Sequence, residues 1–219
     1  MKYTFDIKKT EITKEESYKN KLFNVYVFSF PRSGSSMMTR ICNLLGVNII
    51  HNSDKNKEIM NSRYENMFGS DYHPNPNGFY EIVENQLNNY IDILGTSYSG
   101  CKMLMPVTGV RWELVNLTHS KVILLTRDHK EIISSHEAFY GKLKQTPTED
   151  YLRTATAEQI VKLNKANIDY ITVSYNNIIK NPKKEIEIIK EFIKSDADIK
   201  KAVDFVNIEL YRQRTLCLK

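Results

Sequence analysis

The sequence predicts an α/β fold, a three-layer sandwich in which helices flank a mostly parallel central sheet. Three apolar runs, at 22–30, 121–126 and 170–174, have the length and the β-branched or aromatic content of buried strands. Helical patterns stand between these runs, and strands that alternate with helices favour a parallel sheet covered on both faces. A chain of 219 residues can bury one sizeable core, so we expect a single domain over 1–219 with a polar leader at 1–21.

The first strand and the helix after it are the clearest elements. Pro31 and Gly34 end the apolar run 22–30. A helix is predicted over 33–45, with Gly46 as its C-terminal stop, because apolar residues recur there at helical spacing: Met37, Met38, Ile41, Leu44 and Leu45. A short strand is expected at 47–50 and a helix at 57–68. The segment 70–78 is dense in turn-forming residues and predicts a loop at the edge of the sheet.

The second half of the chain continues the alternation. We expect a helix at 81–94, a strand at 101–105, a helix at 110–117 and a strand at 121–126. Asp128, with Glu131 three residues later, predicts a helix N-terminus close to a capping box. A helix at 148–164 and a strand at 170–174 follow. A last helix closes the fold, with an apolar face of Ile186, Ile189, Phe192 and Ile193.

Composition and charge exclude several classes of protein. The chain is 41% hydrophobic and 26% charged, which is typical of a folded globule and excludes a disordered chain. The net charge of +5 is spread without a long basic run, which favours a solvated surface over a nucleic-acid interface. A few converging cations could still form a local site for an anionic small molecule.

Cysteine usage and hydropathy point to the compartment. Cys42, Cys101 and Cys217 are odd in number and lack metal-ligand spacing, so neither a disulfide framework nor a zinc site is indicated. The polar N-terminus has no apolar signal region, and no run of about 18 apolar residues occurs. These features predict a cytoplasmic protein without a membrane partner.

A loop between the first strand and its helix has the residue types of a phosphate site. Backbone N–H groups at a helix N-terminus converge on anions, and Gly34 lets the backbone approach closely. Ser35 and Ser36 add hydroxyl donors, and Arg32 adds a permanent cation. The loop is therefore P-loop-like, although Ser35 replaces the Lys that nucleoside-triphosphate loops require. The alternative is a plain strand-to-helix turn with serine capping.

This loop resembles that of a known enzyme family. Its sequence is Pro31-Arg-Ser-Gly-Ser-Ser36, similar to the P-[KR]-S-G-[ST]-[ST] loop that holds the 5′-phosphosulfate of 3′-phosphoadenosine 5′-phosphosulfate (PAPS) in sulfotransferases. The segment 127–135 resembles that family's 3′-phosphate motif, an Arg (Arg127) with a Ser (Ser135) eight positions later. Eight helical residues rise about 12 Å, so the Arg has to reach along the helix. Taken alone, an Arg in the place of Arg127 is more often a helix-end salt-bridge partner than a ligand; the two motifs in order reverse that preference and favour the family.

Further segments extend the resemblance over about 24–214. Residues 75–81 resemble the N-P-x-G-[FY]-[YW]-E stretch of a bacterial-type branch, and 100–104 resemble a strand bearing a Lys, here Lys102. Residues 173–182 are similar to a segment whose Tyr, here Tyr175, approaches adenosine. The segment 210–214 matches a closing L-Y-R-x-R that contains Arg212.

The resemblance implies an activity and a donor site. The activity is transfer of a sulfuryl group from PAPS to a hydroxyl or amine of a small-molecule or glycan acceptor, with adenosine 3′,5′-bisphosphate leaving and no metal required. The implied donor-binding residues are Arg32, Ser33, Gly34, Ser35, Ser36, Arg127, Ser135, Tyr175 and Arg212. Two departures stand out: Met37 replaces an aromatic, and Met103 and Leu104 replace the last two residues of a K-T-H segment. A histidine base at that place is excluded.

The expected mechanism needs a cation and a base. Arg32 is the candidate for neutralising charge on the leaving oxygen, since such transfers depend on positioning and electrostatics. Glu81 is the candidate base, although a carboxylate at a helix N-terminus needs no catalytic role. The alternatives are His51, His73 and His136. Two rival functions are an inactive PAPS-binding regulatory protein and a P-loop small-molecule kinase, the latter disfavoured by the missing Lys.

Overall fold

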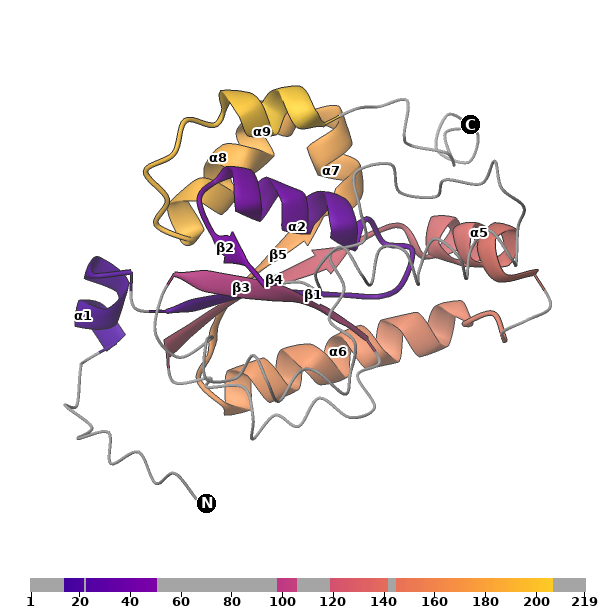
Figure 1. Cartoon of the computed structure of the whole chain (residues 1–219). Coiled ribbons are helices and arrows are strands. Elements are labelled where there is room, and N and C mark those ends of the chain that lie inside the picture. The colour runs from indigo at the N-terminus through magenta and orange to yellow at the C-terminus, as the bar shows by residue number, and fades with distance from the viewer. Residues whose placement is uncertain (1–13, 22, 51–97, 106–118, 142–144, 207–219) are drawn as a thin grey trace, which may run out of the picture.

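The structure is a computed structural model of the whole chain, and it describes residues 14–21, 23–50, 98–105, 119–141 and 145–206. Within these ranges the chain forms an all-parallel sheet with helices on both faces (Figure 1). The predicted α/β three-layer architecture is therefore confirmed. The helices expected at 57–68, 81–94 and 110–117 and the loop expected at 70–78 lie outside the described residues.

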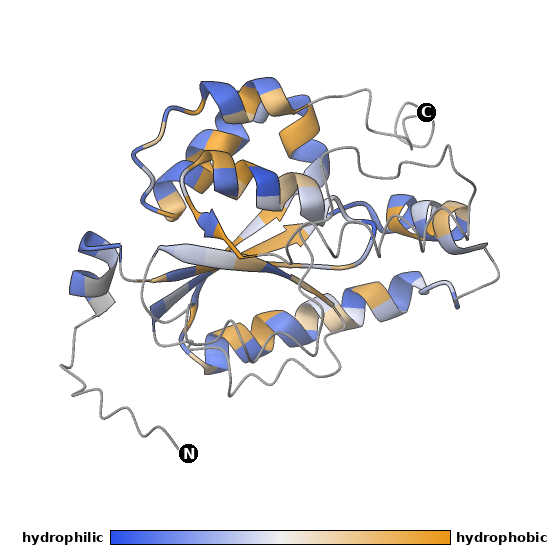
Figure 2. Cartoon of the chain, in the orientation of Figure 1, coloured by the Kyte–Doolittle hydropathy of each residue, from blue (hydrophilic) through white to orange (hydrophobic). Residues whose placement is uncertain are grey.

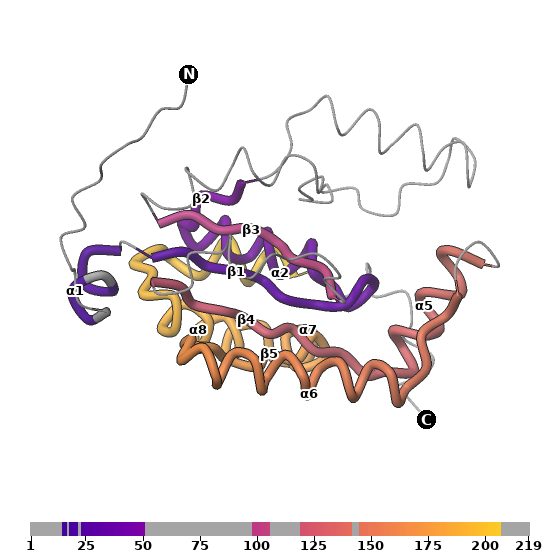
Figure 3. Tube along the Cα trace, turned by 90° about the horizontal axis from the view of Figure 1, so that it is seen from below, coloured from indigo at the N-terminus to yellow at the C-terminus, as the bar shows by residue number. Residues whose placement is uncertain are grey.

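The sheet has its first strand in the middle. The described strands are β1 (Asn24–Ser29), β2 (Asn48–Ile49), β3 (Ser99–Leu104), β4 (Ser120–Thr126) and β5 (Asp169–Ser174). Their order is β2-β3-β1-β4-β5, and Figure 3 shows them side by side in this order. Asn24 lies opposite both Ser99 and Ser120, so β1 pairs in parallel with β3 and β4 from its first residue. The carboxyl ends of these strands consequently meet at one edge.

Successive side chains of β1 point to opposite faces of the sheet and so belong to two hydrophobic cores. Val25 and Val27 pack on the face covered by α2 (Ser35–Leu44), α8 (Pro182–Phe192) and α9 (Lys200–Phe205). Tyr26 and Phe28 pack on the face covered by α5 (His129–Tyr140) and α6 (Glu149–Lys165). Figure 2 shows the mixture of apolar and hydrophilic residues along these helices. Burial on both faces explains the dense apolar residues of β1 and β4, whereas β5 is mostly half-buried.

Most boundaries of the described helices and strands agree with those expected from the sequence. The structure also contains three short helices that were not expected. Two lie after the sheet's last strand, α7 (Tyr175–Lys180) directly behind β5 and α9 near the end of the described chain; the third, α1 (Lys14–Lys19), lies in the polar leader. The Asp128 side chain accepts hydrogen bonds from the backbone N–H groups of Lys130 and Glu131, which confirms it as the N-cap of α5. Among the helices that the structure describes, none combines the length and apolar character needed to span a bilayer.

Candidate functional site

The candidate site lies at the carboxyl edge of the sheet, beside β1. From β1 the chain passes through α2 to β2 on one side, whereas β4 and β5 lie on the other side. In open parallel sheets, ligands bind outside the carboxyl ends of the strands where the strand order changes direction in this way. The predicted phosphate-type loop follows β1 at this point, and Arg127 follows β4 next to it.

A tight turn holds the loop between β1 and α2. The backbone N–H of Ser33 donates to the carbonyl of Phe30 at 3.3 Å, and the Ser33 hydroxyl donates to the same carbonyl at 2.7 Å. Arg32 has φ of 69° and Gly34 has φ of 93°, so both lie in the left-handed region. The fully buried Ser33 hydroxyl stabilises the turn itself, and the N–H groups that begin α2 come directly after it.

Gly34 is required for a second reason besides its backbone conformation. A Cβ atom built at this position would lie 2.2 Å from Cδ2 of Tyr175, the first residue of α7. The buried Tyr175 ring therefore packs directly against the loop backbone. Sequence resemblance places Tyr175 near adenosine; the structure shows it between the loop and Arg127, whose Cζ lies 4.6 Å from the ring centroid.

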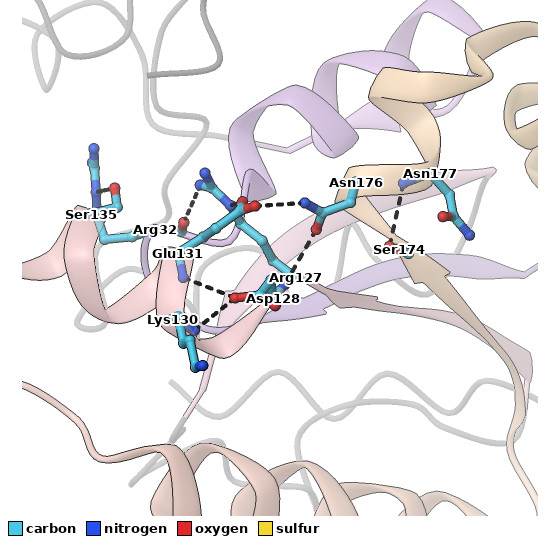
Figure 4. A network of polar contacts seen from close by, with 9 residues as sticks. All are labelled: Arg32, Arg127, Asp128, Lys130, Glu131, Ser135, Ser174, Asn176 and Asn177. Carbon is cyan, nitrogen blue, oxygen red and sulfur yellow. Dashed lines mark hydrogen bonds and ion pairs between the residues drawn. The ribbon is translucent and has the colours of Figure 1, made fainter. Parts of the chain in front are cut away.

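The Arg32 side chain extends from the loop to helix α5. Its Nε donates to the Ser135 hydroxyl at 3.3 Å (Figure 4). Its Cζ lies 4.1 Å from the centroid of the Phe139 ring. Ser135 and Phe139 are one helical turn apart, so they present a hydroxyl and a ring on the same side of α5. The guanidinium is thereby held by one polar and one aromatic contact.

Arg127 is held by a buried carboxylate and by the loop. Its Nε donates to Oε2 of Glu131 at 2.7 Å, and its Nη1 donates to the backbone carbonyl of Arg32 at 3.0 Å. The exposed fractions of the two side chains are 7% for Arg127 and 0% for Glu131. The salt-bridge alternative weighed for Arg127 is therefore present. Arg127 and Ser135 are linked through Arg32, one by its carbonyl and the other by its side chain (Figure 4).

The Glu131 carboxylate also reaches the end of β5. Its Oε1 accepts a hydrogen bond from Nδ2 of Asn176 at 2.9 Å, and Oδ1 of Asn176 accepts from the backbone N–H of Asp128 at 3.2 Å. Asn176 is the second residue of α7. The β4–α5 turn and the β5–α7 junction are thus joined by side-chain hydrogen bonds on either side of Arg127.

A third cation approaches the loop from β3. Lys102 is only 6% exposed, and its Nζ donates to the Ser36 hydroxyl at 3.3 Å, in the first turn of α2. Lys102 lies opposite Val27 of β1, so the neighbouring strand carries it beneath the loop. Because Lys102 contacts Ser36 in the first turn of α2, it belongs to the same cluster of polar side chains as the loop.

Positively charged side chains gather at this edge in the part of the chain that the structure describes. Three cations, Arg32, Lys102 and Arg127, lie in or against the loop, and the Glu131 carboxylate pairs with Arg127. Together with the N-terminus of α2, this arrangement suits an anion with several oxygens. Within the ranges described, no group of three or more His, Cys, Asp or Glu side chains forms a candidate metal site.

Thiol chemistry does not fit the described part of this edge. Cys42 and Cys101 are buried, and burial raises the pKa of both thiols to about 12. They are therefore protonated at neutral pH, when a thiol nucleophile has to be a thiolate.

Most predicted site residues come together, and several unpredicted ones join them. The residues gathered at this edge are Arg32, Ser33, Gly34, Ser35, Ser36, Arg127, Ser135 and Tyr175. Glu81, Arg212, His51 and His73 lie outside the described residues. His136 lies on α5, with its ring centroid 4.5 Å from that of Tyr140. Glu131, Asn176, Phe139 and Lys102 were not predicted as site residues, although the four-residue spacing of Arg127 and Glu131 is a recognisable ion-pair signal.

Comparison with known proteins gives no assignment. No model of a protein family matches this chain, and no curated protein matches it.

Proposed function

We propose that this protein is a PAPS-dependent sulfotransferase that transfers a sulfuryl group to a hydroxyl or amine of a small-molecule or glycan acceptor. The supporting observation is that two segments 95 residues apart in sequence meet at Arg32. One is the loop that resembles a 5′-phosphosulfate site, and the other contains Arg127 and Ser135, which resemble a 3′-phosphate site. A donor with anionic groups at both positions requires such a meeting.

The chemistry assigned to the loop is charge neutralisation. The acceptor oxygen or nitrogen attacks the sulfur, the bond from sulfur to the 5′-phosphate oxygen breaks, and adenosine 3′,5′-bisphosphate leaves. Negative charge grows on the bridging oxygen, where preorganised donors act most strongly. The N–H groups at the start of α2, with Lys102 and Arg32, are the donors within reach of this loop.

The second phosphate is assigned to Arg127 and Ser135. The Ser135 hydroxyl accepts from Arg32, so its own O–H can donate to a phosphate oxygen. Arg127 presents a planar fork of five N–H donors, of which one meets Glu131 and one meets the Arg32 carbonyl. A ligand that lacks the 3′-phosphate should therefore miss these two residues.

Donor binding and turnover test the proposal. Calorimetry should give tight binding of adenosine 3′,5′-bisphosphate and much weaker binding of ATP, because the loop lacks the lysine of triphosphate loops. Label from PAPS should then appear on an acceptor in a library of alcohols, amines and glycans. Binding of the bisphosphate without transfer would favour the inactive regulatory protein, whereas tighter binding of ATP would favour the kinase.

The Arg127→Ala and Ser135→Ala variants are expected to distinguish the two anion positions. Both should weaken binding of adenosine 3′,5′-bisphosphate more than binding of adenosine 5′-phosphosulfate, which has no 3′-phosphate. Ser134→Ala is the matched control on the same helix and should change neither affinity. Equal losses for both ligands, measured by calorimetry, would contradict the assignment.

Glu81 remains the predicted base on sequence grounds. Glu81→Gln keeps the size of the side chain and removes its proton acceptor, so turnover should fall by about 10²–10⁴-fold. Bisphosphate affinity and melting temperature should hardly change. The pH–rate profile should also lose its acidic limb. Activity within a few-fold of wild type, with a His51, His73 or His136 variant inactive, would move the role to that histidine.

A further inference from the structure

We infer that Glu131 is a positioning residue for the donor site, which acts through Arg127 to hold the loop between β1 and α2 in its binding conformation. The role in binding rests on the proposed function, whereas the effect on the loop does not. Arg127 connects Glu131 with the loop, because it donates both to Glu131 and to the carbonyl of Arg32 in the loop.

The contacts form a chain with a defined direction. Asn176 donates to Oε1 of Glu131, which leaves Oε2 to accept from Nε of Arg127. Nη1 of Arg127 then donates to the carbonyl of Arg32. Because a guanidinium is planar and rigid, fixing its Nε also fixes the direction of its Nη1. The orientation of the Glu131 carboxylate thus determines where the Arg32 carbonyl is held.

The conformation held in this way is an unfavourable one. Arg32 has φ of 69°, in the left-handed region that residues with a Cβ atom avoid. The Arg32 carbonyl and the Ser33 N–H belong to the same planar peptide unit. A hydrogen bond to this carbonyl therefore fixes the orientation of that peptide and, through it, of the loop peptides that come next. The same peptide plane precedes Gly34 and the first N–H groups of α2. Loss of the Arg127 contact should therefore disorder the anion-binding backbone before anything else.

A buried ion pair adds little to the free energy of folding compared with apolar residues of the same shape. Removing two charges from water offsets much of their attraction, and apolar residues of similar shape often stabilise a core equally well. Glu131 is fully buried and its two oxygens contact two different elements, α7 and the β4–α5 turn. What the carboxylate supplies and an apolar residue cannot is the direction of Arg127.

Hydrogen exchange in the ligand-free protein tests the effect on the loop. In Glu131→Gln, amide exchange at 33–38 should be faster by about tenfold, with β1, β4 and α6 unchanged. Arg127→Lys should do the same, because lysine keeps the charge and loses the planar fork. Asn176→Ala removes the bonds to Glu131 Oε1 and to the Asp128 N–H but leaves the pair of Glu131 with Arg127, so it should give a smaller increase. It replaces Glu131→Gln as the test if that variant does not fold. Glu137→Gln, the same change at an exposed position of α5, is the control.

Ligand binding provides the second readout. Affinity for adenosine 3′,5′-bisphosphate should fall by about tenfold in Glu131→Gln and remain unchanged in Glu137→Gln. Exchange at 33–38 that stays at the wild-type rate in Glu131→Gln, Arg127→Lys and Asn176→Ala, or rises equally in all strands, would overturn the inference. A wild-type protein that binds no bisphosphate would instead contradict the proposed function, since the exchange experiment contains no ligand.

Discussion

Strand β4 carries a buried cation at each end, and the two surroundings differ. Lys121 lies near the amino end and Arg127 follows the carboxyl end; both are less than a tenth exposed and both lie over aromatic rings. The Lys121 Nζ lies 4.0, 4.6 and 5.7 Å from the ring centroids of Tyr18, Phe192 and Phe23. The Asp169 carboxylate, 3.8 Å away, supplies the opposite charge.

At the amino end of β4, Lys121 therefore has a packing role. The rings around Lys121 come from α1, α8 and the residue before β1, so the lysine fastens α1 and α8 to the edge of the sheet. The pKa of the Tyr18 hydroxyl is raised mainly by burial and secondly by the neighbouring Asp169 carboxylate, so the hydroxyl stays neutral. Desolvated cation–π contacts of this kind contribute about 2 kcal/mol or more.

The carboxyl end combines a similar cation with features that packing does not require. Arg127 contacts the Arg32 carbonyl as well as the Glu131 carboxylate, and Lys102 contacts Ser36 of the same loop and helix start. That loop has two left-handed residues and leads into a helix N-terminus. The comparison teaches that a buried cation over a ring does not by itself indicate a ligand site. Several cations gathered beside a loop that leads into a helix N-terminus are the stronger reason to propose one.

The largest expected effect separates the two ends by chemistry. Arg32→Ala should lower sulfuryl transfer by about 10²–10³-fold, because a preorganised donor acts mainly in the transition state. Donor affinity should fall less. Lys121→Met, which removes a cation of similar burial from the other end, should leave the transfer rate of the folded protein unchanged. Unchanged transfer in Arg32→Ala would remove the loop from the chemistry.

The second effect separates the ends by stability. Lys121→Ala should lower the free energy of unfolding by about 2–3 kcal/mol, through lost stem packing and lost cation–π contacts. Urea denaturation measures the loss, and calorimetry of the folded variant should give wild-type affinity for adenosine 3′,5′-bisphosphate. A large loss of affinity with intact stability would mean that the amino end also takes part in binding.

The smallest effect compares two glycines, one near each end. Gly34 and Gly46 have φ of 93° and 91°, but an added Cβ meets the Tyr175 ring at Gly34 and nothing within 4 Å at Gly46. Gly46→Ala should destabilise the fold by about 1–2 kcal/mol from backbone strain alone. Gly34→Ala should cost about 1–2 kcal/mol more, from overpacking against Tyr175. Equal melting temperatures for the two variants would show that the ring moves aside without cost.

Strands β1 and β4 were predictable because both of their faces are buried. The apolar runs at β1 and β4 are typical of buried strands. Asp128 indicated the start of α5, because its side chain is suited to cap a helix N-terminus. The helices α7 and α9 were missed because six residues carry too little periodicity. Ser174, which was assigned only to the strand, caps α7 by accepting from the Asn177 N–H.

The site was predictable where it depends on local sequence and not where it depends on tertiary contacts. The order of the two motifs predicted the loop and the segment from Arg127. Glu131 fitted a capping box, yet its carboxylate contacts Arg127 and Asn176, because a buried cation attracts it more strongly than a backbone N–H. The Arg32–Ser135 contact spans 103 residues and depends on strand order, which no local pattern contains.

A titration of the ¹⁵N-labelled protein with adenosine 3′,5′-bisphosphate tests the central claim most directly. Amide shifts should change first and most strongly at 32–36, 127–135 and 174–176, at the carboxyl ends of β1, β4 and β5. Amides around Lys121 and Asp169, at the other end of the same strands, should not move. Shifts confined to the amino end, or none at millimolar ligand, would contradict the claim that the carboxyl edge is a nucleotide donor site.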